Sequence, residues 1–118
     1  MACIKTAALA LAGAALLSSC AVILPVVITS DKDGTLRGTS TATRSEGTIR
    51  VSNERMTCMG TYDPLTQTPT IGLTFQCSDG RRGFAVVTRT TANSGSGTVR
   101  MSDGSTGKLV FGEAATAF

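Results

Sequence analysis

The stretch Gly47-Thr48-Ile49-Arg50-Val51-Ser52-Asn53 decides the fold, because its side chains change character with a period of two. Ile49 and Val51 are apolar, whereas the residues that alternate with them are polar. This alternation is typical of a β-strand with one face in a core and the other in water. The same pattern returns in Gly97-Thr98-Val99-Arg100-Met101-Ser102-Asp103. We therefore expect the chain to build its core from β-strands.

The similarity of these two stretches extends to their neighbours. Arg37-Gly38 precedes Thr43-Arg44 at the same spacing as Arg82-Gly83 precedes Thr88-Arg89. We interpret the agreement as one pattern that occurs twice. The two copies cover residues 29–60 and 77–112. Two copies are too few for a solenoid, so we expect the halves to pack face to face or to close into a barrel.

Turn signals separate the expected strands. Asp33-Gly34, Asp79-Gly80 and Asp103-Gly104 suit tight hairpin turns, because these turns need the positive φ that glycine adopts readily. Strand-like segments cover residues 35–43, 48–52, 70–77, 84–91, 98–102 and 108–111. No stretch after residue 20 has a helical period. We predict an all-β domain, a small antiparallel barrel or sandwich of about six to eight short strands, after an N-terminal signal helix.

The N-terminus has the organisation of an export signal. Lys5 precedes an apolar run over residues 7–17, and small residues follow it. The end of this segment, Leu17-Ser18-Ser19-Cys20, resembles the lipobox of bacterial lipoproteins. The resemblance implies that residues 1–19 are removed, that Cys20 is acylated, and that the lipid holds the protein to a membrane. Because residue 21 is Ala rather than Asp, it further implies an outer-membrane location facing the periplasm.

Two other fates of the leader remain open at this point. Residues 6–28 are apolar enough to be read as one uncleaved membrane span, although Ser18, Ser19 and Pro25 interrupt them. Ordinary cleavage would instead release a soluble protein. Residues 20–32 are expected to form either a tether from the lipid or the first strand, and residues 33–118 the β-domain.

Cysteine usage indicates a covalent staple. Cys3 lies in the leader and Cys20 in the lipobox, which leaves Cys58 and Cys77 as a pair in the exported part. A disulfide between them suits a domain with no Trp and one Tyr, whose core contains few large side chains. A metal site or a reactive thiol is the alternative, but two thiolates in a chain without His make a poor zinc site.

The composition argues against catalysis and against nucleic-acid binding. Without His, the chain has neither a Ser-His-Asp triad nor an imidazole ligand, and its eight acidic residues are scattered. We expect no enzyme activity, no cofactor and no metal. The net charge of +3 is too small to indicate nucleic acid as a partner. The segment Asp31-Lys32-Asp33-Gly34-Thr35 lacks the later ligands of a calcium loop and is expected to be a turn.

Matched arginines are the only candidate binding residues. Arg50 and Arg100 occupy the same place in the two copies, as do Arg37 and Arg82. They could form a basic strip for lipopolysaccharide phosphates, peptidoglycan carboxylates or an acidic envelope protein. The alternative is a solvated strand face that merely protects sheet edges.

These observations predict a non-catalytic lipoprotein of the cell envelope that binds or braces an envelope partner. Two alternatives stay open. One is a periplasmic inhibitor or ligand binder, because envelope lysozyme inhibitors are similar in outline, with a lipobox, a small β-barrel and one disulfide. The other is an accessory lipoprotein of a secretion or assembly machine.

Overall fold

A computed structural model describes residues 21–65, 68–91 and 93–117 of the chain. The expected signal helix, its cleavage site and Cys20 lie outside these described residues.

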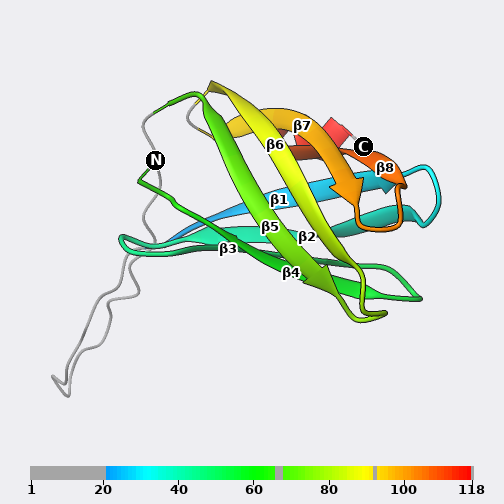
Figure 1. Cartoon of the computed structure of the whole chain (residues 1–118). Helices are drawn as coiled ribbons and strands as arrows, with labels where there is room; N and C mark the ends of the chain where they lie inside the picture. The colour runs from blue at the N-terminus through cyan, green and yellow to red at the C-terminus, as the bar shows by residue number, and fades with distance from the viewer. Residues whose placement is uncertain (1–20, 66–67, 92, 118) are drawn as a thin grey trace, which may run out of the picture.

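Eight antiparallel strands close into one barrel (Figure 1). Each strand pairs with the next along the chain, and the last pairs with the first. The strands are β1 (Val22–Ser30), β2 (Gly34–Ala42), β3 (Gly47–Ser52), β4 (Thr57–Tyr62), β5 (Thr70–Cys77), β6 (Arg82–Thr91), β7 (Ser94–Met101) and β8 (Thr106–Gly112). The predicted all-β fold is confirmed, and of the two predicted architectures the structure has the barrel.

Alternation along the strands places the core inside the barrel. In β3, Ile49 and Val51 are buried while Arg50 is exposed. In β5, every second residue is buried from Ile71 to Cys77. The interior is filled by branched aliphatic side chains with few large rings, of which Phe75 is the most buried. This interior follows directly from the period of two in the sequence.

Residues 22–30 are the first strand rather than a tether, so the barrel begins well before residue 33. β1 pairs with β2 along its whole length and with β8 over residues 26–30. Val26 and Ile28 face the core, which explains the apolar character of this segment. The segment 22–28 that an uncleaved span would use is therefore part of the sheet. In the described part of the chain, no helix is long and apolar enough to cross a membrane.

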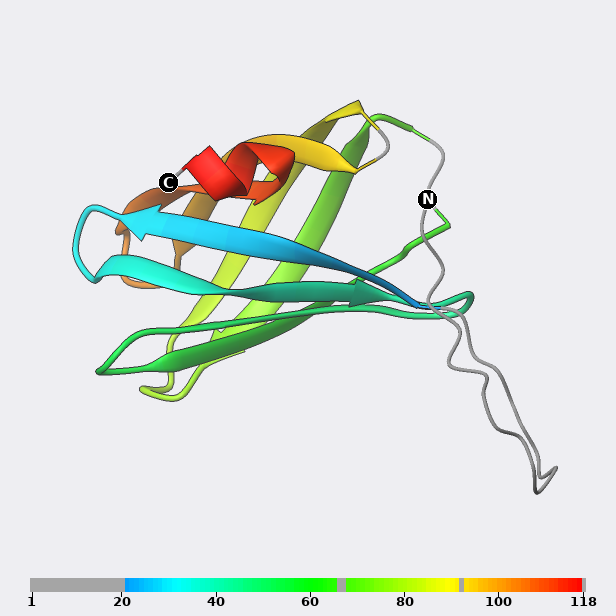
Figure 2. The same cartoon turned by 180° about the vertical axis from the view of Figure 1, so that it is seen from behind.

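A single turn of 3₁₀-helix, η1 (Glu113–Ala117), follows β8. It lies against β1, β7 and β8 (Figure 2). Val27 points outward by its place in β1 and is nevertheless only 4% exposed. We attribute this burial to η1, whose Ala115 is also buried.

The two copies of the sequence pattern occupy equivalent hairpins. Gly38 of β2 pairs with Val51 of β3, and Gly83 of β6 pairs with Met101 of β7. The first four strands thus correspond to the last four.

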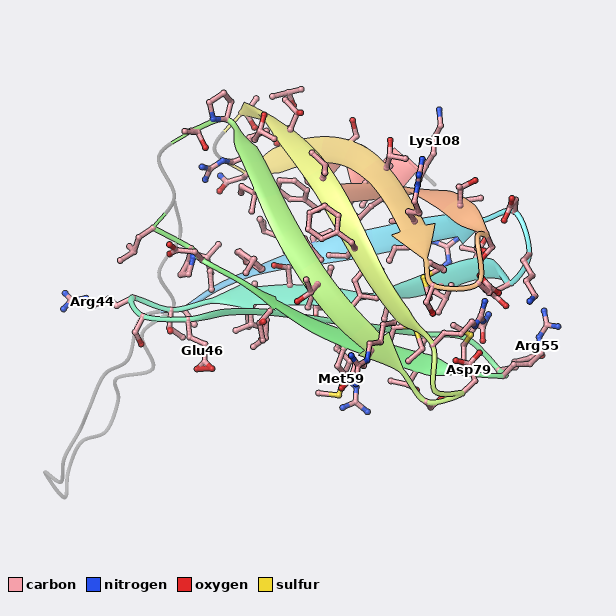
Figure 3. All side chains as sticks on the ribbon, viewed as in Figure 1. Arg44, Glu46, Arg55, Met59, Asp79 and Lys108 are labelled. Carbon is pink, nitrogen blue, oxygen red and sulfur yellow. A yellow bond between two sulfur atoms is a disulfide. The ribbon has the colours of Figure 1, made fainter. Side chains whose placement is uncertain are left out.

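The barrel has two unlike ends (Figure 3). The turn end carries the four connections 31–33, 53–56, 78–81 and 102–105, and Arg55 and Asp79 mark it in the figure. The mouth end carries the start of β1 and the connections 43–46 and 63–69, and Arg44 and Glu46 mark it. Three of the turn-end connections use the expected glycines in a left-handed conformation, with φ of 80° at Gly34, 94° at Gly80 and 93° at Gly104.

Close packing requires a glycine at position 38 in β2, and this requirement predicts the effect of a substitution on stability. A Cβ on Gly38 would collide with the backbone carbonyl oxygen of Arg50, whereas a Cβ on Gly72 would meet only the exposed ring of Phe84, at 3.3 Å. We expect Gly38→Ala to lower the free energy of unfolding by about 1–3 kcal/mol through overpacking, and Gly72→Ala to change it little. Urea unfolding of both variants checks this. Equal stability of the two variants would contradict the packing argument.

Candidate binding surface

The turn end is closed by one arginine, Arg81. Its Nη2 lies 2.9 Å from Oδ1 of Asp33 and 2.7 Å from Oδ2 of Asp79, and its Nη1 lies 2.9 Å from Oδ2 of Asp103. The three carboxylates come from three different connections, so the guanidinium ties these connections together. Lys32 extends the network, with its Nζ 2.8 Å from Oδ2 of Asp103. The Arg81 side chain is only 15% exposed.

The pKa values of Arg81, Asp79 and Asp103 are shifted in the directions that favour their charged forms. Hydrogen bonds to Asp33, Asp79 and Asp103 raise the pKa of Arg81 above its ordinary value. Hydrogen bonds from Lys32 and Ser105 hold the pKa of Asp103 below its ordinary range. The pKa of Asp79 is lowered by its bonds to Arg81. Groups shifted in these directions do not exchange protons near neutrality, so the network is suited to holding the turns and not to acid–base chemistry.

The barrel interior is too small for a ligand. A cavity of about 40 Å³ lies among apolar side chains near a hydrogen bond of 2.7 Å between Ser40 Oγ and Tyr62 Oη. A second cavity beneath the turn end measures about 20 Å³. Ligand pockets usually have volumes of about 300–1,000 Å³. Neither of these interior cavities is large enough for such a ligand.

Charge is divided unevenly over the outside of the barrel. Every Asp and Glu of the chain lies in a connection between strands or in η1, and none lies in a strand. The outward-facing charged residues of the strands are all basic, and we name them the cationic belt: Arg37, Arg50, Arg82, Arg100 and Lys108. Each lies within three residues of the strand end that meets the turn end. The belt thus surrounds the part of the wall nearest that end.

The four arginines singled out in the sequence fall into two groups within this belt. Arg37 and Arg50 are diagonal neighbours across β2 and β3, because Arg37 pairs with Ser52. Arg82 and Arg100 are diagonal neighbours across β6 and β7, because Phe84 pairs with Arg100. The structure places all four on the outer wall, but β4 and β5 separate the groups.

The outer face of β6, β7 and β8, which we name the β6–β8 face, combines positive charge with exposed apolar surface. Phe84 lies opposite Arg100 in the register, and Val86 lies opposite Thr98, which in turn faces Lys108. Phe84 is 49% exposed and Val86 44%. The ion pairs described above use Lys32 and Arg81, and none of them uses Arg82, Arg100 or Lys108. The guanidinium and ammonium groups of the β6–β8 face are therefore open to an anion from outside.

A shallow groove lies between the two arginine groups and has Arg82 in its lining. It measures about 540 Å³ and crosses the outer wall from β3 to β6. Across it, one register row runs from Arg50 through Met59 and Gln76 to Arg82. Met59 projects from the wall (Figure 3), is 53% exposed and receives a contact of 3.9 Å from Nη1 of Arg50 to its Sδ. The lining also contains three threonines and Phe75: Thr48, Thr61, Thr74 and Phe75.

Sequence reasoning missed several members of this surface. Lys108, Met59, Phe84 and Val86 were not singled out, although their outward direction follows from the same period of two that places the arginines. Within the described ranges, no group of three or more His, Cys, Asp or Glu side chains is placed to hold a metal ion.

The fold and its surface define a class of molecule: a small, filled, disulfide-bonded β-barrel with a cationic outer wall. In comparisons with models of known families, with curated proteins and with solved structures, the chain matches none of them.

Proposed function

We propose that this protein is a non-catalytic lipoprotein of the cell envelope that is held by an acylated Cys20 and binds an anionic envelope partner through its cationic belt. The observation that carries the proposal is the charge segregation of the wall, where five outward cations stand on strands that contain no acid. A merely solvated face would be expected to mix charges of both signs.

Three features support the rest of the proposal. The lipobox-like end of the leader supports lipid anchoring, and Ala21 supports an outer-membrane location. The Cys58–Cys77 disulfide supports an oxidising compartment such as the periplasm. The small interior cavity and the raised pKa of Arg81 favour a role in binding or bracing a partner. Phosphates of lipopolysaccharide, carboxylates of peptidoglycan and an acidic protein share the required anionic chemistry.

Removing charge from the belt should weaken capture of the partner. We expect the triple variant Arg82→Gln, Arg100→Gln, Lys108→Gln to recover roughly 10- to 100-fold less partner than the wild type, since each surface ion pair contributes up to about 1 kcal/mol. The measurement is crosslinking of the lipidated protein in cells, followed by purification and quantification of what is bound.

Arg44→Gln with Arg55→Gln is the control, because these exposed arginines lie in connections outside the belt. Binding of the purified protein to lipopolysaccharide micelles, to peptidoglycan sacculi and to any co-purified protein identifies the source of the anion. Equal recovery with the belt variant and the control variant would overturn the role of the belt.

A further inference from the structure

We propose that the mouth end of the barrel sits directly on the lipid surface that anchors Cys20, with Ile23 and Leu65 in contact with the bilayer. This inference rests on the proposed function, because it requires an acylated Cys20. It adds an orientation that the lipobox alone does not give. The turn end and the cationic belt then face away from the membrane.

The first argument is the length of the connection. Only Ala21 separates Cys20 from the start of β1 at Val22. An extended residue spans at most about 3.6 Å, so the Cα of Val22 lies within about 7 Å of the Cα of the acylated residue. A long polar tether would let the barrel move away from the bilayer, whereas one residue holds this end of it at the interface.

The second argument is the chemical character of the mouth end. Of the exposed large apolar side chains, Leu65 is the most exposed at 66%, and Ile23 is 53% exposed. Leu65 lies in the 63–69 connection and Ile23 is the second residue of β1, so both lie at the mouth end. The connections at this end also carry the charged residues Arg44, Glu46 and Asp63. The outward-facing strand residues next to them are uncharged: Pro25, Thr39, Thr41, Thr48, Thr61, Thr70, Gly72, Val86, Thr88, Ser96 and Val110. Apolar and hydroxyl groups suit a lipid interface.

The third argument is the position of the cations. Lys108 pairs with Thr29, which is seven residues along β1 from Val22. At about 3.3 Å per residue, this places Lys108 roughly 23 Å along the strand from the mouth end. That distance exceeds the Debye length of about 8 Å at physiological ionic strength. Lys108 is therefore beyond the reach of the headgroups of the anchoring bilayer and stays available to a partner.

The chain contains no Trp, so the fluorescence of a single introduced Trp reports only on its own position. This makes contact of the mouth end with the bilayer measurable. The lipidated full protein carrying Leu65→Trp is reconstituted into phosphatidylcholine–phosphatidylglycerol vesicles with brominated acyl chains. Arg55→Trp is the matched control, since it places the indole at the turn end. At position 65 we expect the Trp emission to be blue-shifted and its intensity to fall by about half or more through quenching by the bromine atoms. At position 55 we expect no quenching.

Each outcome decides the proposal. Protein that floats with the vesicles while Trp at position 65 stays unquenched overturns the seating and leaves the lipid anchor standing. Equal quenching at positions 65 and 55 overturns the orientation. Failure of the wild type to float shows that Cys20 carries no lipid, which overturns the proposed anchoring and the seating together. Ile23→Trp is the second reporter and decides the question if Leu65→Trp does not fold.

Discussion

Arg81→Met should lower the free energy of unfolding by about 2–3 kcal/mol, because it leaves carboxylates from three connections without their shared cation. Asp33 is affected most, since its side chain is only 16% exposed and lies 2.9 Å from the guanidinium. Methionine retains an apolar side chain, so the loss of the guanidinium, including its 3.4 Å contact from Nη2 to Sδ of Met56, is the main change. Urea unfolding at neutral pH measures the loss.

Arg55→Met is the matched control at the same end of the barrel. Its side chain is exposed in the 53–56 connection, where the described hydrogen bond uses only its backbone N–H. We expect this variant to lose less than about 0.5 kcal/mol. A loss of similar size in both variants would show that the Arg81 network does not hold the turns.

The same network determines how acid affects stability. The pKa values of Asp79 and Asp103 are lowered in the folded state from the ordinary value of 3.8, so the unfolded chain binds protons more readily. Their contribution is complete above about pH 4 and is lost as the pH falls through the folded pKa values. The stability difference between the wild type and Arg81→Met should therefore narrow below pH 4. Unfolding curves at pH 7, 4 and 2.5 test this, and an unchanged difference would contradict it.

Local patterns in the sequence were sufficient for the strands and the turns. Ile49 and Val51 alternate with polar residues in the sequence and are buried in β3. Asp33-Gly34, Asp79-Gly80 and Asp103-Gly104 form the expected turns, because positive φ is a local requirement that glycine meets. The pairing of Cys58 with Cys77 followed from elimination and is present in the structure.

Closure of the barrel and the Arg81 network were beyond local reasoning. Closure depends on pairing Val26 with Phe111, residues from the two ends of the domain, and no short segment encodes that contact. The partners Asp33 and Asp103 lie 48 and 22 residues from Arg81. The sequence also shows Arg81 and Arg82 side by side without indicating which faces inward. Register decides that, and register is a property of the whole sheet.

The disulfide lies between β4 and β5, the two neighbouring strands with the fewest register pairs; we name this pairing the β4–β5 seam. β4 and β5 share four register pairs in the described chain, whereas β1 and β2 share nine. Cys58 and Cys77 stand directly opposite each other in that seam, with Cα atoms 3.9 Å apart. A covalent bond there compensates for the short ladder. It also ties β4, the last strand of the first half of the barrel, to β5, the first strand of the second half.

Replacing both cysteines by alanine should therefore cost about 3 kcal/mol, the chain-entropy value for two residues 19 apart, with some further loss of packing. The loss should be localised as well. Backbone amides of residues 57–61 and 74–77 should exchange with deuterium faster relative to those of β6 and β7, because the seam opens first. Reductant should shift the urea midpoint of the wild type and leave that of the double variant unchanged. Uniform acceleration of exchange around the barrel would show that the bond stabilises the whole domain and not this seam. A β4–β5 pairing that needs the bond would also make folding depend on oxidation, which agrees with the export proposed above.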